Sequence, residues 1–371
     1  MPTLTTYSLD EVSHYKLYGR TDETMRPLPL FWNGSAIEVN VTGSELWIDL
    51  EVDCDFHEPW IYTELNGAFM SRQMLLPGMN SLCLFRSMTA GVPKTMKFQR
   101  ELQAMHEDDH CHIFVKGFRT DGDFLPLKEN KYKLEFIGDS ITSGEGTYGA
   151  LPDTDWLAMY MSSSQNYATY ISKELDADYR IISQGGWGVY CGWDNDVRHN
   201  IPSIYEKICG LGYGETNASV GAMKDYDFSS WIPDAIIVNL GTNDNSAFNQ
   251  PPFTVPETGL TYKQHRNEDG TYAEEDIEKF RVSVYNFLKM LRKHNPTSHI
   301  VWTYGMLGYD LTLPISEAIL RYQKDTNDSN VAFLNLPNTT QETVGAHGHP
   351  GVLSHKRAAK VLSEYLQQIL S

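Results

Sequence analysis

The sequence has no long apolar run. Its 371 residues contain no uninterrupted apolar stretch of about 18 residues, the length typical of a helix that spans a bilayer. The opening residues, MPTLTTYSLDEVSHYKLYGR, also lack a basic start followed by an apolar segment, which is the pattern of a signal peptide. We therefore expect no membrane partner, and either a cytoplasmic location or secretion if a leader has been removed.

Cysteine and positive charge are also scarce. The five cysteines are odd in number and lack CxxC spacing, which predicts buried thiols in a reducing compartment rather than disulfides. The 30 Lys and Arg residues face 48 Asp and Glu residues, so the formal net charge is −18. Such a surface repels phosphates, which excludes nucleic acid and anionic lipid as partners. A neutral sugar or an uncharged ester suits it better.

Short alternating segments rich in β-branched and aromatic residues occupy the first third of the chain. They are AIEVNV (36–41), ELWIDLEV (45–52), WIYTEL (60–65), SLCLF (81–85) and HIFVKGF (112–118). Turn residues such as Thr42-Gly43 and Pro77-Gly78 separate these segments. Regularly spaced short strands of this kind predict an antiparallel β-sandwich of the jelly-roll type over residues 1–128.

The pattern changes in residues 129–371, where short apolar runs alternate with helical segments. The runs are KLEFIG (133–138), YRIIS (179–183), DAIIVNLG (234–241), HIVWTYG (299–305) and NVAFLNL (330–336). Between them, residues 274–293 and later 352–370 carry apolar residues at helical spacing. This order predicts an α/β domain with a parallel five-stranded sheet. Such sheets build their sites at the carboxyl ends of the strands.

The first candidate site residue is the serine of Gly138-Asp139-Ser140, directly after the first of these strands. The turn that follows a strand would present the Ser140 hydroxyl at the carboxyl edge of the sheet. A serine hydroxyl is a weak nucleophile and needs a base to accept its proton. The alternative is that Asp139 and Ser140 only cap the following turn.

Two further motifs follow later elements of the same domain. Asn243, in Gly-Thr-Asn-Asp (241–244), comes after the strand DAIIVNL, where its amide N–H can face a developing oxyanion. His349-Pro350 lies just ahead of the last helix, because proline suits the first helical turn. The alternative interpretations are a simple turn for the first motif and a solvated surface histidine for the second.

In this order, the three motifs resemble the SGNH hydrolase (GDSL esterase) family over residues 131–371. In that family a serine, a glycine, an asparagine and a histidine come from four separated blocks. The resemblance implies Ser140 as nucleophile, His349 as general base, and an oxyanion hole made by the N–H of Ser140, the side chain of Asn243 and a glycine N–H. Gly188 is predicted as that glycine from its distance to the strand end, with Gly186 as the alternative. Either glycine can instead serve a tight turn or close packing.

One position departs from this family. Most members carry an aspartate three residues before the histidine, which completes a triad, but this sequence has Ala346 there. His347 cannot replace an anion, and no spacing directs Glu342 at the imidazole. The Nδ1–H of His349 must therefore find another acceptor, and we expect a backbone carbonyl. These residues predict a Ser-His dyad that uses no metal and no cofactor.

A dyad combined with an N-terminal sandwich resembles carbohydrate esterase family 2. Residues 18–21 and 31–38 also resemble the opening of that family, so the resemblance covers nearly the whole chain. It implies an acetylesterase that removes O-acetyl groups from oligo- or polysaccharides such as xylan and mannan, often from the 6-position of a hexose. Residues 1–128 would be an accessory domain that either binds carbohydrate or only buttresses the catalytic domain, 129–371.

Aromatic residues follow the glycine block. Trp187, Tyr190 and Trp193 are candidates for stacking on a sugar ring, with core or loop packing as the alternative. His110 and His112 suggest a metal site, but two ligands at that spacing rarely suffice, so we expect no zinc.

Two other functions compete with the acetylesterase. The first is a lipid or acyl-thiol esterase of the same superfamily, against which the sandwich and the lack of an apolar lid-like segment argue. The second is a non-catalytic carbohydrate-binding protein, against which the intact Ser140, Asn243 and His349 argue. The sequence leaves the oligomeric state open.

Overall fold

The computed structural model describes residues 2–371, and they form two compact units. The first unit contains the residues up to Asn130 together with Leu157–Ser164 and Lys207–Tyr226, and the second contains Lys131–Trp156, Gln165–Glu206 and Asp227–Ser371. The sequence-based boundary at residue 128 lies close to the first of these junctions. The sequence-based division did not place residues 157–164 and 207–226 in the first unit, because these segments have no strand pattern and their position depends on long-range packing.

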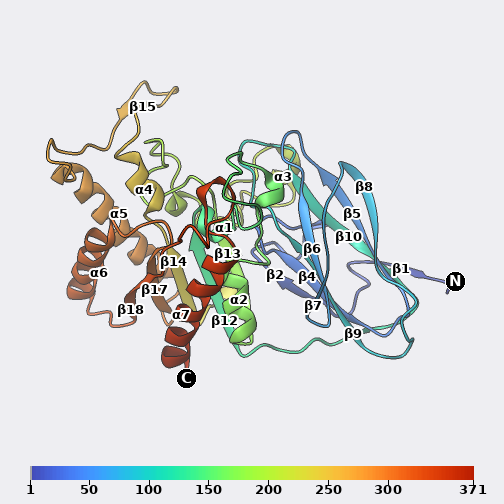
Figure 1. The fold of residues 1–371 in the computed structure, drawn as a ribbon. Coiled ribbons are helices and arrows are strands. Elements are labelled where there is room, and N and C mark those ends of the chain that lie inside the picture. The colour runs from blue at the N-terminus through green and yellow to red at the C-terminus, as the bar shows by residue number, and fades with distance from the viewer. Residues whose placement is uncertain (1) are drawn as a thin grey trace. The chain divides into compact units, whose positions relative to one another are not determined.

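The first unit contains two antiparallel sheets (Figure 1). One has the order β1 (Thr5–Ser8), β10 (His112–Thr120), β5 (Leu46–Asp53) and β8 (Gly78–Phe85), with β3 (Leu28–Pro29) paired to β10. The other has the order β11 (Phe124–Leu125), β4 (Ala36–Val41), β9 (Lys94–Arg100), β6 (Trp60–Leu65) and β7 (Ala68–Met74), with β2 (Lys16–Tyr18) paired to β4. Two short helices, η1 (Ala158–Tyr160) and α3 (Glu215–Ser219), also belong to this unit.

Alternation of side chains explains why these segments pair as sheets around one core. Along β5, Leu46, Ile48 and Leu50 are fully buried, whereas the residues between them are half-exposed. Strand side chains point alternately to opposite faces, so one face of the strand joins the core. That core contains residues of both sheets, among them Ile37 of β4 and Ile113 of β10. The predicted antiparallel sandwich is therefore confirmed.

The second unit is built on a parallel sheet. Within residues 2–371 its strands follow the order β13 (Ala177–Ser183), β12 (Tyr132–Gly138), β14 (Ala235–Asn239), β17 (His299–Gly305) and β18 (Val331–Leu336), and every pair is parallel. This confirms the predicted five-stranded sheet. The register places Gly138 opposite both Ser183 and Asn239, so the loops after β12, β13 and β14 leave the sheet at the same edge.

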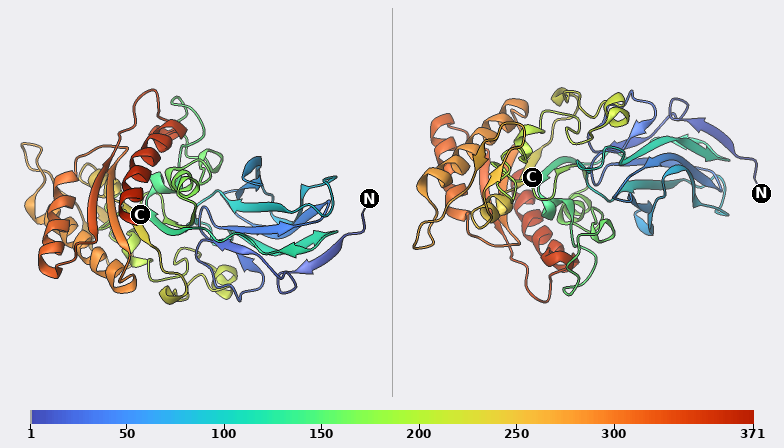
Figure 2. Two further views of the ribbon diagram at one scale, coloured as in Figure 1. Left: turned by 90° about the horizontal axis from the view of Figure 1, so that it is seen from below. Right: turned by 90° about the horizontal axis from the view of Figure 1, so that it is seen from above.

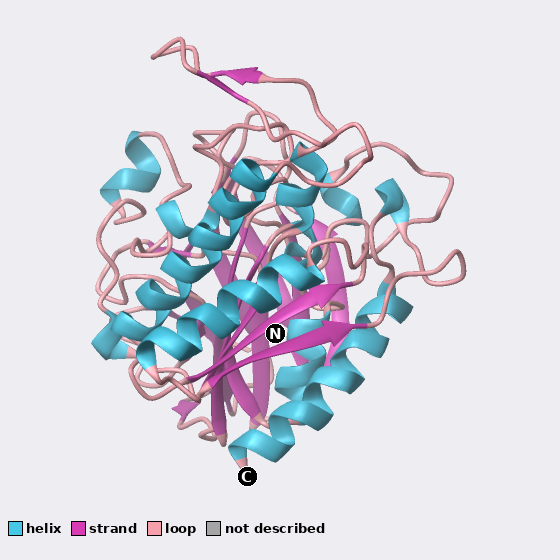
Figure 3. Cartoon of the chain, turned by 90° about the vertical axis from the view of Figure 1, so that its left-hand side faces the viewer, coloured by secondary structure: helices cyan, strands magenta, loops and turns pink. Residues whose placement is uncertain are grey.

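Helices cover both faces of this sheet (Figure 3). The long ones are α2 (Tyr167–Glu174), α5 (Glu274–His294), α6 (Thr312–Thr326) and α7 (Val352–Leu370). Helix α2 packs against α7, and α5 packs against α6. Figure 2 shows α7, in red, on the other side of the sheet from α5 and α6, in orange. The short elements are α1 (Ser140–Ser143), η2 (Ile201–Ser203), η3 (Phe228–Ser230), α4 (Thr242–Ala247), η4 (Ala346–Gly348) and the hairpin of β15 (Phe253–Thr254) and β16 (Thr261–Tyr262).

Helix α5 illustrates how the sequence specifies these helices. The apolar residues that recur at helical spacing are all buried: Ile277, Phe280, Val284, Phe287, Leu288 and Leu291. Acidic residues occupy its first turn and basic residues its last turn, which suits the helix dipole. The predicted amphipathic helix over 274–293 is confirmed.

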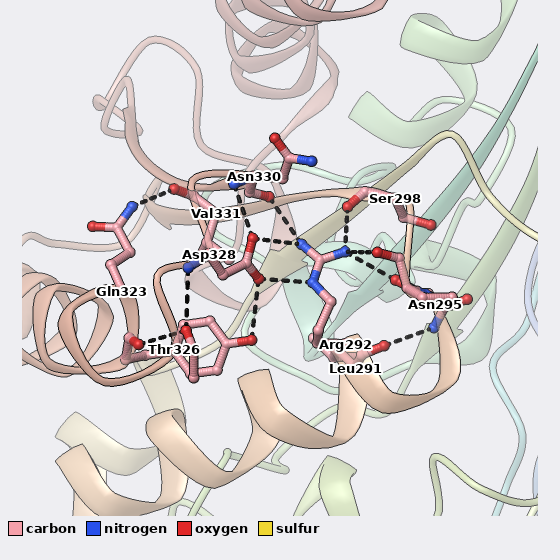
Figure 4. A network of polar contacts seen from close by, with 11 residues as sticks. Leu291, Arg292, Asn295, Ser298, Gln323, Thr326, Asp328, Asn330 and Val331 are labelled. Atoms are coloured by element: carbon pink, nitrogen blue, oxygen red, sulfur yellow. Dashed lines mark hydrogen bonds and ion pairs between the residues drawn. The ribbon is translucent and has the colours of Figure 1, made fainter.

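A polar network connects the end of α5 to β17 and β18 (Figure 4). The guanidinium of Arg292 donates to the Asp328 carboxylate at 2.7 Å and to the carbonyl oxygens of Ser298 at 2.7 Å and Asn330 at 3.3 Å. Because Ser298 precedes β17 and Asn330 precedes β18, one side chain fixes the amino ends of two strands. The carboxyl ends of the same strands are left for the loops of the site.

All five cysteines are free thiols, as their spacing predicted, but the predicted burial holds only for Cys111, Cys191 and Cys209, because Cys54 is half-buried and Cys83 is exposed. In the part of the chain that the structure describes, no helix is both long and apolar enough to cross a bilayer.

Candidate active site

The turn after β12 presents Ser140 at the first position of α1. The Asp139 side chain caps this helix by accepting the N–H of Ile141 at 3.0 Å, so the capping role weighed in the sequence is real for Asp139. Glycine is required at 138, because a Cβ there would lie 2.0 Å from the Thr142 hydroxyl oxygen. Burial raises the pKa of the Asp139 carboxyl to about 7.

The loop after β18 brings His349 to this serine. The His349 Nε2 lies 2.9 Å from the Ser140 Oγ, and Nδ1 lies 2.8 Å from the carbonyl oxygen of His347. A carbonyl can only accept a hydrogen bond, so Nδ1 carries the ring proton. The lone pair on Nε2 is then available to accept the proton of the serine hydroxyl. The backbone acceptor expected in place of an aspartate is thus the His347 carbonyl.

Sequence reasoning missed Glu145, which lies beside this histidine loop. Its side chain is 8% exposed, and its Oε1 lies 2.7 Å from the His347 Nδ1 and 3.6 Å from the His349 Nδ1. The N–H of Glu145 donates to the Ser140 carbonyl, so this carboxylate belongs to the turn that carries the serine. Its position five residues after Ser140 was the only signal in the sequence, and nothing in that spacing directs it at His349.

His347 holds a backbone conformation that few side chains adopt. Its φ is 53° and its ψ is 28°, in the left-handed region. This conformation costs roughly 1–2 kcal/mol in a non-glycine residue. In it, the His347 carbonyl oxygen faces the His349 ring. Its N–H donates to the Asp153 carbonyl at 2.6 Å and its ring nitrogen binds Glu145, so both ends of the residue are anchored.

Asn243 lies in the first turn of α4, after β14. Its Nδ2 donates one hydrogen to the Trp187 carbonyl at 2.9 Å, which orients the amide and leaves its second N–H for another acceptor. The neighbouring Asp244 accepts the N–H groups of Val189, Tyr190 and Cys191 at 2.8 to 3.2 Å. Burial raises the pKa of Asp244 to about 6, against the opposing effect of these hydrogen bonds.

The glycine block differs from the prediction. The N–H of Gly188 already donates to the His199 carbonyl at 3.3 Å, which argues against its assignment as an oxyanion donor. A Cβ at 188 would lie 2.3 Å from the Cys191 carbonyl oxygen and 2.4 Å from Asp244, so close packing explains this glycine. Gly186, the alternative, has a φ of 79° and is half-exposed in the turn after β13.

The three aromatic candidates differ in how far they are exposed. Trp187 is buried and stacks on His199 with ring centroids 5.0 Å apart, so its predicted contact with a sugar is corrected to a packing role. Trp193 is 49% exposed. Its indole lies beside Gly186, since a Cβ at that glycine would be 3.2 Å from the Trp193 Cδ1. Tyr190 is half-buried.

Tyr190 also borders a cavity of about 640 Å³. Polar side chains and a second tyrosine line most of the rest, including Tyr262, Gln264, Asp276 and Lys279. Most of the lining residues come from β16, the segment that connects it to α5, and the first turns of α5. Through Tyr190, the cavity therefore adjoins the segment 189–191, whose N–H groups Asp244 accepts.

The two histidines that suggested a metal site, His110 and His112, make other contacts. His110 pairs with Asp55 at 3.0 Å, and His112 is buried and stacks on Phe114. Among the residues that the structure describes, the group whose ligand atoms lie within 4.8 Å of one another is instead Glu145, His347 and His349.

Comparison with known proteins supports the resemblance seen in the sequence. Residues 134–362 match the family GDSL-like Lipase/Acylhydrolase. An acetyl xylan esterase, Est2A, from the rumen bacterium Butyrivibrio proteoclasticus is 56% identical over 99% of each chain, with a TM-score of 0.98. A family two carbohydrate esterase from Clostridium thermocellum, solved with cellohexaose, shares the fold at 21% identity and a TM-score of 0.76 over 96% of this chain and 99% of that one.

Among curated proteins, the chain is 22% identical over 344 residues to the cellulase/esterase CelE of Acetivibrio thermocellus. That alignment covers 91% of this chain, and the chain spans only 37% of the length of that relative. The family match and the similarity along the whole chain agree with the resemblance drawn from the motifs. The chain belongs to the GDSL-like lipase/acylhydrolase family of carboxylic ester hydrolases, and along its whole length it is similar to an acetyl xylan esterase.

Proposed function

We propose that this protein is a carbohydrate O-acetylesterase that removes acetyl groups from xylan- or mannan-type oligo- or polysaccharides. The observation that carries the proposal is the hydrogen bond between the Ser140 Oγ and a His349 ring whose tautomer is set by a backbone carbonyl. The 56% identity to an acetyl xylan esterase supports the acetylated sugar as the substrate. In this proposal all catalytic residues come from 129–371, and residues 1–128 are accessory.

The first step transfers the acetyl group to the enzyme. His349 Nε2 accepts the proton of the Ser140 hydroxyl while the Oγ attacks the acetyl carbonyl carbon. When the tetrahedral intermediate collapses, the bond between the carbonyl carbon and the sugar oxygen breaks. The sugar oxygen leaves with the proton held on Nε2. The products are acetyl-Ser140 and a free sugar hydroxyl.

The second step hydrolyses this acetyl-enzyme. A water molecule gives its proton to Nε2 and adds to the acetyl carbon, after which acetate leaves and Ser140 regains its proton. In both steps the N–H of Ser140, the free amide hydrogen of Asn243 and the N–H of Gly186 stabilise the oxyanion. Gly186 replaces Gly188 in this role because the N–H of Gly188 already donates to His199.

Glu145 acts as a positioning residue in this mechanism. It binds the His347 ring at 2.7 Å and so holds the strained residue whose carbonyl orients His349. At 3.6 Å from the His349 Nδ1 it also lies near the positive charge that forms on the ring when Nε2 takes the proton. It thus supplies from the serine turn part of what an aspartate at 346 supplies in a triad.

The sugar is proposed to lie against Trp193 and Tyr190. An exposed indole is a suitable stacking surface for a sugar ring, and Trp193 is 49% exposed beside Gly186. The cavity beside Tyr190 offers hydroxyl, amide and carboxylate groups that match the hydroxyls of a further sugar unit.

Two measurements test the proposal. NMR of acetylated xylan and mannan oligosaccharides, before and after treatment with the protein, is expected to show loss of acetyl signals and release of acetate. A series of aryl esters from acetate to octanoate is expected to show a sharp preference for acetate. Wild-type protein that prefers octanoate, or a Ser140→Ala variant that retains the activity, would overturn the proposal.

A further inference from the structure

A carboxylate and two imidazole rings meet at one point of the site. Glu145 Oε1 lies 2.7 Å from the His347 Nδ1 and 3.6 Å from the His349 Nδ1, and the ligand atoms of the group all lie within 4.8 Å of one another. The two rings are nearly parallel, at an interplanar angle of 10° and a centroid distance of 5.3 Å. Both Nδ1 atoms therefore lie close to the same carboxylate oxygen.

These donors are the types that a borderline divalent cation selects. Two histidines and one glutamate are the protein ligands of some catalytic zinc sites, in which water or substrate takes the fourth position. The Glu145 carboxylate is 8% exposed, so it lies in the less polar surroundings where attraction to a cation is strong. The His347 side chain is 40% exposed, which leaves an approach for the ion and for a water ligand.

The distances are close to what coordination requires. With bonds of about 2.0–2.1 Å, tetrahedral donors lie about 3.4 Å apart. The two distances from the carboxylate, 2.7 and 3.6 Å, fall on either side of that separation. The loop that carries both rings includes Gly348, where a Cβ would meet nothing within 4 Å, so there is room for the small shift needed.

We propose that Glu145, His347 and His349 form a site for Zn²⁺ whose occupancy inhibits the esterase. The inhibition, but not the binding, rests on the proposed function. On binding, the ion takes the Nδ1 lone pair of each histidine, and the single ring proton of each neutral imidazole moves, through water, from Nδ1 to Nε2. The His349 Nδ1–H bond to the His347 carbonyl is lost in exchange for the bond to zinc.

Loss of activity follows from the tautomer. With Nδ1 bound to zinc, the ring proton of His349 resides on Nε2. Nε2 then has no lone pair for the serine proton and instead donates to the Ser140 Oγ. The same histidine is therefore a base without the ion and a hydrogen-bond donor with it, and removal of the ion restores the base.

The test uses the full chain, freed of metal with EDTA and then dialysed. Isothermal titration with ZnCl₂ is expected to show one site per chain, and hydrolysis of 4-nitrophenyl acetate is expected to fall as that site fills and to return when EDTA is added. MgCl₂ is the control ion, because Mg²⁺ prefers oxygen ligands and is expected neither to bind there nor to inhibit.

Two variants locate the site. Glu145→Gln and His347→Asn each remove one ligand, and asparagine tolerates the left-handed backbone of 347. Each variant is expected to bind zinc at least about tenfold more weakly (one tenfold step is about 1.4 kcal/mol). Inhibition of each variant is measured relative to its own activity without metal. His110→Asn is the matched control, because His110 pairs with Asp55 and is not one of the three ligands, so its loss should leave binding unchanged.

Ser140→Ala separates this inference from the proposed function, since it should be inactive yet bind zinc with unchanged stoichiometry. The inference is overturned if wild-type protein binds no zinc, or if both ligand variants, shown to be folded by circular dichroism, bind it as tightly as wild type. Zinc bound at this site without loss of activity would overturn the inhibition. An inactive wild type that still binds zinc would contradict the proposed function alone.

Discussion

At the scale of single residues, the histidine is oriented by the backbone of its own loop. The carbonyl of His347 accepts the Nδ1–H of His349 at 2.8 Å, and the left-handed φ of 53° belongs to the residue that supplies it. A strained conformation persists when its surroundings hold it in place. Here the hold comes from Glu145 and from the Asp153 carbonyl.

We predict that Glu145→Gln lowers kcat for 4-nitrophenyl acetate roughly 10- to 100-fold, because small misplacement of a catalytic group is costly. KM should change little, since Glu145 is not proposed to touch the substrate. Steady-state kinetics on metal-free protein measures both constants, and Glu145→Asp tests whether a shorter carboxylate restores part of the rate.

The pathway of this effect is tested by combining Glu145→Gln with His347→Asn. If Glu145 acts through His347, the double variant should be no slower than the slower single variant. Losses in kcat that multiply in the double variant would instead assign Glu145 a separate, direct effect on His349. Glu342→Gln, an exposed residue near the same loop, serves as the control and should leave kcat unchanged.

At the scale of elements, the segment after β13 is held by the first turn of α4. Asp244 accepts three consecutive N–H groups, those of Val189, Tyr190 and Cys191. The same short helix carries Asn243, whose amide is bound to the Trp187 carbonyl. One helix of six residues thus carries Asn243, one of the proposed oxyanion donors, and binds the segment from Trp187 to Cys191.

We predict that Asp244→Asn lowers kcat roughly tenfold or more, because an amide presents hydrogens to a row of N–H groups and displaces the segment from the oxyanion hole. The measurement is kcat with aryl acetate alongside the melting temperature. A variant with an unchanged rate would show that the segment keeps its place without the carboxylate. Asp194→Asn, a half-buried aspartate of the same loop, is the comparison.

A second element-scale prediction concerns Arg292. Arg292→Ala should lower the free energy of unfolding by about 2 kcal/mol, because Asp328 and four backbone carbonyls, those of Asn295, Pro296, Ser298 and Asn330, lose a donor. Activity at low temperature should persist, since the network lies at the amino ends of the strands. Denaturant unfolding measures the change.

The matched control for Arg292 is Arg321→Ala. That side chain is 54% exposed and pairs with Glu278 at the surface, so its loss should cost no more than about 1 kcal/mol. Equal destabilisation by the two variants would contradict a specific role for the Arg292 network.

At the scale of the whole molecule, stability depends on pH through buried carboxyls. The folded pKa of Asp139 is raised to about 7 and that of Asp244 to about 6, in both cases by burial. Between the unfolded pKa of about 3.9 and these values, the folded state binds more protons than the unfolded state. Stability from these groups is therefore present at low pH, falls as pH rises through this window, and is level above about pH 7.

We predict that Asp139→Asn removes part of this dependence, because the amide has no charged form to bury. The melting temperature of the variant minus that of wild type should be several degrees higher at about pH 8 than at about pH 5. Thermal unfolding at the two pH values measures it. Asp225→Asn, at an exposed residue whose pKa is lowered by Lys207, should show no such gain at the higher pH.

The elements were predictable from sequence because their periodicity is local. AIEVNV and WIYTEL coincide with β4 and β6 residue for residue, and the apolar positions of α5 are the buried ones. The order of the GDS, GTND and HP motifs also pointed to the family, since each follows a strand or precedes a helix whose pattern is visible. Ser140 and His349, far apart in the chain, were paired through that order.

Only the tertiary structure decided which other groups contact the site residues. Glu145 reaches the histidine loop through the packing of two turns, Trp187 is buried against His199, and the N–H of Gly188 is taken by a carbonyl eleven residues later. None of these contacts has a spacing that a local pattern can reveal. The sequence by itself determined the two folds, the order of the motifs and the missing aspartate at 346, because these follow from local periodicity and residue type. Which groups orient the histidine was set by long-range packing, and so only by the folded chain.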